Sequence, residues 1–80
     1  MNIIKFKTDS DKYPSELEDI KNNTIRFTDD WDIKRWGKVQ LATHIKIINA
    51  GDQRQYFVRK IRHKCTYKNL AIITWEPEKK

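Results

Sequence analysis

Cysteine, glycine and proline are scarce in this sequence, and it contains no long apolar run. Its one cysteine, Cys65, cannot form an intramolecular disulfide, which is typical of a protein of the reducing cytoplasm. Nine aromatic residues, with only two glycines and two prolines, argue against a disordered tail. No stretch approaches the roughly 20 apolar residues of a membrane span, and no signal-peptide core follows Met1. We expect one small cytoplasmic domain over residues 1–80, without membrane contact and with a polar tail at 76–80.

Acidic residues are nearly missing from the second half of the chain. Residues 1–32 carry five Lys or Arg against eight Asp or Glu, whereas residues 33–80 carry twelve against three. Between Ile33 and Trp75 the one acid is Asp52. Because like charges repel, so uneven a distribution favours a polyanionic partner such as RNA or another single-stranded nucleic acid. The alternative is that the N-terminal acids fold back and pair with the basic half.

Apolar patterning predicts a strand near each end of the chain. Asn2–Lys7 places Ile4 and Phe6 on one side, which is typical of a half-buried strand. Leu70–Trp75 is a continuous apolar run, which is typical of a buried strand. An exposed edge along this last strand would be a natural seam for a homo-oligomer.

A short helix is expected after Pro14. Ser15 followed by Glu18 fits a capping box, in which the hydroxyl accepts from a free helix-start amide. Leu17 and Ile20 would then share the inner face of a helix of about two turns.

Two central stretches alternate between apolar and polar residues. Thr24–Thr28 predicts a strand with Ile25 and Phe27 facing the core. Residues 39–48 show the longest alternation in the chain and predict a strand of about ten residues with Ile45 in the core.

Residues 54–67 fit either a strand or a helix. Aromatic and β-branched residues directly after a turn at 49–52 favour a strand, whereas the spacing of Phe57, Ile61 and Cys65 would suit a helix. We favour the strand. The predicted fold class is therefore α+β, a small curved antiparallel sheet or partly open β-barrel of about five strands with one short helix.

The densest basic stretch lies within residues 54–68. As a strand it places Lys60, Arg62 and Lys64 on one face, with about 6.5–7 Å between successive side chains. Such a row of cations fits the phosphates along an extended nucleic-acid strand, and neighbouring aromatic or imidazole rings can stack on its bases. The alternative is an ordinary solvated sheet face.

A second basic cluster surrounds two tryptophans. Trp31 and Trp36 are interleaved with Lys34, Arg35 and Lys38, a pattern that fits base stacking beside phosphate contacts. The alternative is that both indoles complete a small core.

The candidate nucleic-acid-binding residues combine these two clusters with one lysine of the 39–48 stretch. They are Lys34, Arg35, Trp36, Lys38, Lys46, Arg54, Arg59, Lys60, Arg62, His63, Lys64, Tyr67 and Lys68.

Metal and cofactor sites are not expected. His44, His63 and Cys65 are the only nitrogen or sulfur ligands and fall short of the four that a structural zinc site takes. No glycine-rich phosphate-binding motif occurs. A metal-independent ribonuclease, with His or Lys as acid and base and Arg stabilising the phosphorane, stays open as the one enzymatic alternative.

The sequence thus favours non-catalytic binding of RNA or single-stranded nucleic acid through a basic strand face with flanking aromatics. The rival is a small phage- or plasmid-type inhibitor or antitoxin that blocks a protein partner, including an RNA-dependent one. Salt separates the two, because phosphate-driven affinity falls steeply with ionic strength and an apolar interface keeps most of its affinity.

Overall fold

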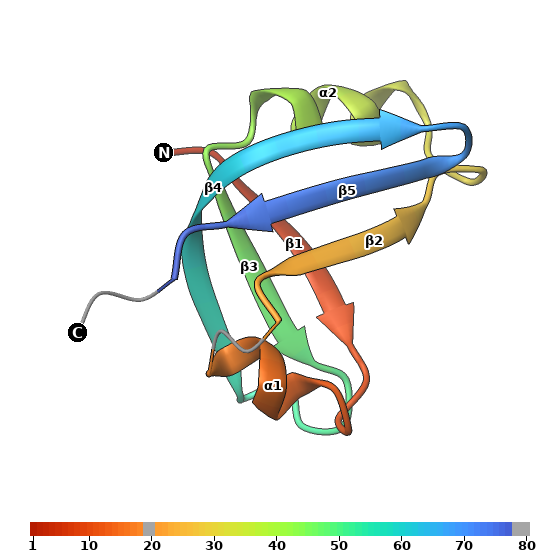
Figure 1. Cartoon of the computed structure of the whole chain (residues 1–80). Coiled ribbons are helices and arrows are strands. Elements are labelled where there is room, and N and C mark those ends of the chain that lie inside the picture. The colour runs from red at the N-terminus through yellow and green to blue at the C-terminus, as the bar shows by residue number, and fades with distance from the viewer. Residues whose placement is uncertain (19–20, 78–80) are drawn as a thin grey trace.

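A computed structural model describes residues 1–18 and 21–77, with five strands and two short helices (Figure 1). The strands are β1 (Ile3–Thr8), β2 (Asn23–Phe27), β3 (His44–Asn49), β4 (Tyr56–Tyr67) and β5 (Leu70–Trp75). The helices are α1 (Tyr13–Leu17), which follows β1, and α2 (Ile33–Leu41), which follows β2. Neither helix in the described part of the chain has the length and apolar character that crossing a membrane requires.

The five strands form one curled sheet in the order β1-β3-β4-β5-β2, which makes half a barrel (Figure 1). β1 and β3 are parallel, and the other three pairings are antiparallel. β4 is twelve residues long and joins the two halves of the sheet, of which one contains β1 and β3 and the other β5 and β2. Its first part pairs with β3 and its second part with β5. β1 and β2 are the two edges of the sheet. The α+β class with a small curved sheet, as predicted from the sequence, is confirmed.

The core fills the inside of the curl. Ile45, Ile47 and Trp75 are fully buried, and Ile4 and Ile73 are buried almost completely. Burial of each such side chain contributes roughly 1.5–3 kcal/mol. The predictions that Ile4 and Ile45 belong to the core are confirmed.

The two helices cover opposite ends of the half-barrel, with α2 at the top and α1 at the bottom of Figure 1. The predicted capping box is wrong, because α1 begins at Tyr13 and no side chain caps it. Ser15 lies inside the helix, where its hydroxyl donates to the carbonyl of Lys12 at 3.0 Å.

The inner face of α1 is also different from the prediction. Leu17 is 39% exposed, whereas Tyr13 and Glu16 are buried. The helix instead turns Tyr13 and Glu16 inward, and Glu16 is accommodated because the Thr8 hydroxyl donates to its Oε2 at 3.0 Å. Ile20, the other predicted inner residue, lies outside the described residues.

The ten-residue strand predicted over residues 39–48 is wrong in its first part. α2 extends to Leu41, and β3 begins only at His44. The reason lies upstream, where Asp32 caps α2 by accepting from the backbone amide of Arg35 at 2.8 Å. Val39 is buried as a helical residue, and Leu41 is 70% exposed.

β2 has the opposite orientation to the one predicted. Ile25 and Phe27 are 55% and 68% exposed, and Thr24 is buried instead. The register explains this, because Thr24 lies opposite Ile73 on the core face of β5, whereas Ile25 lies opposite Ile72 on its outer face. Directly opposed residues of a strand pair share a face of the sheet.

The strand predicted within residues 54–67 is confirmed as β4, but it contains a bulge. The pairing shifts between Ile61 and His63, which leaves Arg62 as the extra residue. β5 is confirmed as a strand. The prediction that it is an exposed edge is wrong, because β5 lies between β4 and β2.

Candidate nucleic-acid interface

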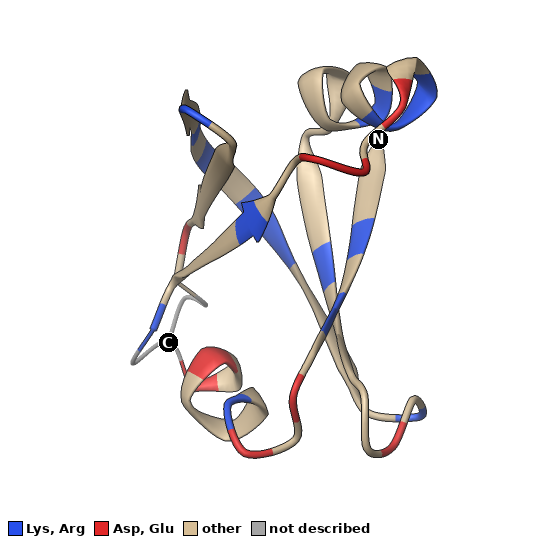
Figure 2. Cartoon of the chain, turned by 90° about the vertical axis from the view of Figure 1, so that its right-hand side faces the viewer, with Lys and Arg blue, Asp and Glu red and all other residues tan. Residues whose placement is uncertain are grey.

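The charge of the strands is entirely positive. The described strands contain eight Lys or Arg residues and no Asp or Glu. Figure 2 shows basic positions on the middle of the strands, with acidic positions in α1 and in the segments between elements. The described strands therefore contain no acid of their own to balance these cations.

The largest ordered array of these cations lies on the outer side of β1, β3 and the first part of β4. The strand register sets nine side chains in three rows across it. The rows are Ile3–His44–Lys60, Lys5–Lys46–Val58 and Lys7–Ile48–Tyr56, and together they are called the basic face.

Lysine and an aromatic ring meet on the basic face. The Lys46 ammonium lies 4.0 Å from the centre of the Tyr56 ring, and 53% of Tyr56 is exposed. Neighbouring strands are about 4.8 Å apart, so Lys5 and Lys46 present two charges side by side. The face therefore offers charge for phosphates and an exposed ring for stacking.

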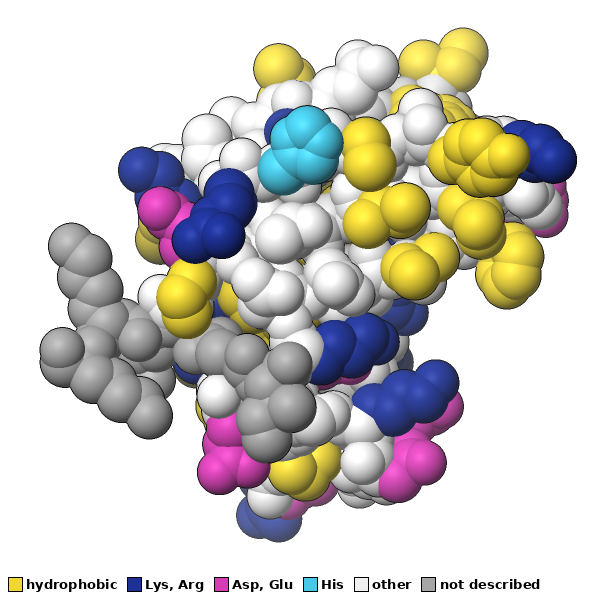
Figure 3. Space-filling view, in the orientation of Figure 1, with side chains coloured by type: hydrophobic (Ala, Val, Ile, Leu, Met, Phe, Trp, Pro, Cys, Tyr) yellow, Lys and Arg dark blue, Asp and Glu magenta, His cyan; other side chains and the backbone are white. Residues whose placement is uncertain are grey.

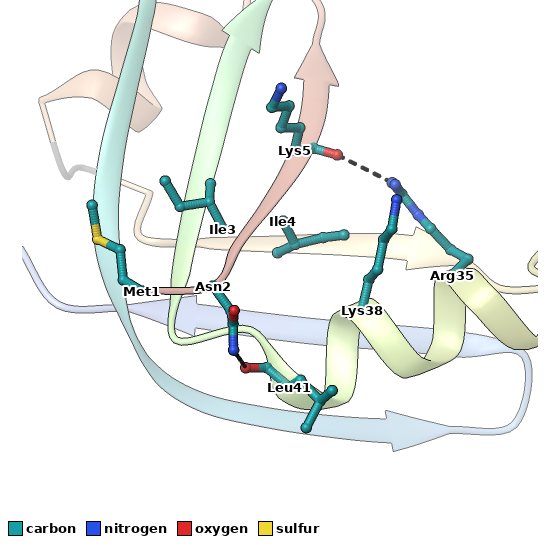
Figure 4. Close-up of a pocket in the computed structure, with 8 residues that line it drawn as sticks. All are labelled: Met1, Asn2, Ile3, Ile4, Lys5, Arg35, Lys38 and Leu41. Carbon is teal, nitrogen blue, oxygen red and sulfur yellow. Dashed lines mark hydrogen bonds between the residues drawn. The ribbon is translucent and has the colours of Figure 1, made fainter.

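α2 extends this basic surface past the edge of β1. Arg35 Nη2 donates to the carbonyl oxygen of Lys5 at 3.1 Å, which ties the helix to the free edge of the strand (Figure 4). Lys38, one turn later, points to the same side, and both cations line a hollow of about 450 Å³. At its far end Asn2 Nδ2 donates to the Leu41 carbonyl at 3.2 Å.

A second hollow, of about 520 Å³, lies where the edges of β1 and β2 face each other; it is called the arginine seam. The residues that line it are Lys5, Phe6, Lys7, Ile25, Arg26, Phe27, Asp30, Trp31 and Arg35.

Two guanidinium groups of the arginine seam contact one aromatic ring. The Cζ atoms of Arg26 and Arg35 lie 4.8 and 4.6 Å from the centre of the Phe6 ring. Trp31 stacks on Phe6 with 6.2 Å between ring centres. Burial lowers the pKa of Arg26 and the charge of Arg35 lowers it further, while Glu16 opposes the effect. Two cations are therefore held close together at a partly buried place.

The cluster predicted around residues 31–38 is only partly brought together. Lys34, Arg35 and Lys38 line one hollow beside Trp31. Trp36 instead lines a separate hollow between α2 and the β4-β5 hairpin, together with Val39 and Ile73. Its ring and that of Trp31 are packed in a T-shaped arrangement, with 4.9 Å between the ring centres.

The row predicted on β4 does not exist as one face, and the bulge is the reason. The extra residue Arg62 inverts the alternation, so that Lys60 lies on the outer side and Lys64 on the inner side. Lys64 Nζ donates to the carbonyls of Val39, Gln40 and Ala42 at 2.8–3.0 Å and so caps the end of α2.

Arg59 lies on the inner side of β4. Its guanidinium lies 4.7 Å from the centre of the Phe57 ring and donates to the carbonyls of Val58 and Leu17. These contacts give Arg59 a role in joining α1 to the sheet.

The other predicted residues are scattered. Arg54 lies in the β3-β4 turn and hydrogen bonds to Asp52, which lowers the pKa of that carboxyl group. Lys68 forms the β4-β5 turn with a positive φ of 53° and contacts the Tyr67 ring. His63 is exposed beyond the bulge, opposite Thr74.

Three cations of this surface were missed by the sequence reasoning. Lys5 and Lys7 alternate with buried Ile4 and Phe6, and this alternation was the signal that could have found them. Arg26 gave no such signal, because the apolar residues on either side of it predicted the opposite face of β2.

The outer side of the other half of the sheet is apolar. Across β2, β5 and the second part of β4 the register aligns two rows, Phe27–Leu70–Tyr67 and Ile25–Ile72–Cys65. These six residues are called the apolar face. Figure 3 shows hydrophobic side chains gathered on this part of the surface.

No cluster of three or more His, Cys, Asp or Glu that could hold a metal ion occurs among residues 1–18 and 21–77. Cys65 is a free, exposed thiol.

No family model, no curated protein and no solved structure matches this chain.

Proposed function

We propose that this protein binds a single strand of RNA or DNA, without catalysis, along the basic face and the adjoining side of α2. The observation that carries the proposal is the composition of the basic face, which holds Lys5, Lys7, Lys46 and Lys60 and no acidic residue. Along a strand, side chains on one face recur at about 6.5–7 Å, a step that successive phosphates of an extended strand can follow.

The apolar members of the basic face support a single strand over a duplex. Tyr56 is exposed at one corner of the basic face, in the row of Lys7 and beside the row of Lys46, and offers a ring on which an unpaired base can stack. Stacking of one base contributes about 1–3 kcal/mol and needs little sequence preference. Bases inside a duplex are not free to stack on a side chain.

The test is a triple variant, Lys5→Ser, Lys46→Ser and Lys60→Ser, in anisotropy titrations with a labelled single strand between about 50 and 200 mM salt. A matched control removes three charges elsewhere, by Lys12→Ser, Arg54→Ser and Lys68→Asn, where Asn suits the positive φ of residue 68. The triple variant should lower the slope of log affinity against log salt by about 2, at roughly 0.7 for each lost contact. Equal slopes for the triple variant and its control would show that the basic face is not the site.

A second candidate function is favoured by one other observation, the apolar face. Phe27, Tyr67 and Ile25 are each more than half exposed and lie in adjacent rows, although most monomers scatter such residues singly. A surface of this kind fits a protein partner, as in an inhibitor or antitoxin. Because the two faces belong to different halves of the curled sheet, one chain can use both.

The second function is tested by Ile25→Thr with Phe27→Ser. This variant should lose affinity for a protein partner and keep its affinity for single strands that lack a terminal phosphate, and the lost interaction should show little salt dependence. Retained partner binding by the folded variant would exclude the apolar face.

A further inference from the structure

We infer that the arginine seam binds a phosphate monoester, namely the terminal phosphate of the strand that lies on the basic face. The inference rests on the proposed function, and it adds a preference for strand ends. Two residues connect the sites, because Lys5 and Lys7 belong to the basic face and also line the seam.

The charge of the seam suits a dianion. Lys5, Lys7, Arg26 and Arg35 line it with one carboxylate, that of Asp30. In the described part of the chain neither arginine forms an ion pair with an acidic residue. A phosphodiester inside a strand carries one negative charge, whereas a terminal phosphate carries nearly two at neutral pH.

Both arginines of the seam have guanidinium N–H groups that can donate to phosphate oxygens. Arg26 Nε donates to Thr24 Oγ1 at 2.8 Å, and Arg35 Nη2 donates to the Lys5 carbonyl. Within residues 1–18 and 21–77 the Nη groups of Arg26, and Nε and Nη1 of Arg35, donate no hydrogen bond. A planar guanidinium group can bind a phosphate through two parallel N–H···O hydrogen bonds. Contact with the Phe6 ring restrains the planes of both guanidinium groups.

The shape of the seam favours an end over the middle of a strand. Its floor is Phe6, which is only 6% exposed, and its walls come from the edges of β1 and β2. A terminal phosphate can enter such a hollow from one side. For an internal phosphate to bind there, the nucleic-acid strand would have to enter the hollow and leave it again.

The experiment compares three labelled strands of one sequence, with a 5′-phosphate, with a 3′-phosphate and with neither. The natural chain should bind one phosphorylated strand about tenfold more tightly than the unphosphorylated strand. Arg26→Lys keeps the charge but removes the paired donors, so it should abolish this preference. Arg62→Lys is the matched control, because it makes the same change at an exposed arginine outside the seam, and it should keep the preference.

A second variant is needed because substitution of the partly buried Arg26 could itself disturb the fold. Lys7→Gln changes an exposed side chain that lines the same hollow, and it should weaken the preference with an unchanged melting temperature. Preference lost in both Arg26→Lys and Lys7→Gln supports the seam. Preference kept in both variants overturns it.

Two outcomes separate this inference from the proposed function. Equal binding of all three strands overturns the inference and leaves the proposed function standing. Binding of none of them overturns the proposed function, and a titration with a nucleoside 5′-monophosphate then decides about the seam. A shift of the Trp31 indole N–H resonance without a shift of Trp75 supports the seam, and no shift of Trp31 overturns it.

Discussion

The ammonium nitrogen of Lys64 lies 2.8 Å from the carbonyl oxygen of Gln40, and within the described residues it forms no ion pair with an acid. Its ammonium group donates to three carbonyls at the C-terminal end of α2, where backbone amides no longer satisfy every carbonyl of the helix. A cation at this end also interacts favourably with the helix dipole. Lys64 therefore joins β4 to α2, in a segment whose composition predicted contact with a nucleic acid.

We expect Lys64→Met to lower the free energy of unfolding by about 1.5–3 kcal/mol, the usual range for hydrogen bonds to a charged group. Lys60→Met, at an exposed position four residues earlier, should change it by no more than about 0.5 kcal/mol. Urea denaturation of both variants provides the measurement. Equal loss of stability would contradict the capping role of Lys64.

Ile45→Asp should unfold the protein, whereas Lys46→Asp should leave it folded. Ile45 is fully buried between β1 and β4, and an unpaired carboxylate there costs several kcal/mol, a large part of the stability of so small a core. Lys46 points outward, so its substitution should mainly weaken binding to single strands. Circular dichroism melting curves of the two variants test this, and matching curves would refute the register of β3.

The inverted orientation of β2 predicts that Phe27 contributes little to stability. Phe27→Ser should lower the free energy of unfolding by less than about 1 kcal/mol. Phe57→Ser, which removes a ring that is only 5% exposed, should cost at least about 3 kcal/mol. Chemical denaturation measures both, and a large loss for Phe27→Ser would mean that β2 faces the core.

Alkaline pH should destabilise the protein through Tyr13. Burial raises the pKa of its hydroxyl above 10.0, although the charge of Arg59 opposes the shift. A raised pKa means that the fold favours the protonated form, so this stability is complete below the ordinary pKa and is lost as the pH rises through the higher one. Tyr13→Phe keeps the ring that packs against Phe57 and should lose less stability than the natural chain between pH 8 and about 10.5. Parallel losses in the two proteins would exclude Tyr13 as the cause.

The local pattern of apolar residues was sufficient to predict the strands whose apolar side faces the core. β1, β4 and β5 were predicted as strands, and Ile4 and Ile45 as core residues, because their alternation or apolar run reports directly on burial. The same reasoning failed at β2, where alternation was present but the pairing with β5 turned its apolar side outward. Which side of an edge strand faces inward is decided by its partner and cannot be read from the strand alone.

The candidate site was harder to predict than the fold. A single extra residue, Arg62, moved Lys64 from the expected row of cations to the inner side, and no local signal marks a bulge of this kind. The arginine seam unites Phe6, Arg26 and Arg35 from three elements, so it depends on the curl of the whole sheet. By contrast, Lys46 and Lys60 were predicted and do lie in the basic face, since their strand positions alone set their side.

The strand order also has a consequence for the time at which the fold can form. Ile3 of β1 is paired with His44 of β3, and Asn23 of β2 is paired with Thr74 of β5. Both early strands therefore have partners only in the second half of the chain. To form contacts between such distant positions, the chain must close long loops, and the entropy of loop closure is lost before the contacts stabilise the fold. We therefore expect folding in the range of milliseconds to seconds. On the ribosome, at about 5–20 residues per second, β2 would wait several seconds for β5 to be made. Until then Ile25 and Phe27 sit on an unpaired strand, and a nascent chain in that state is where we expect chaperone contact or aggregation to begin.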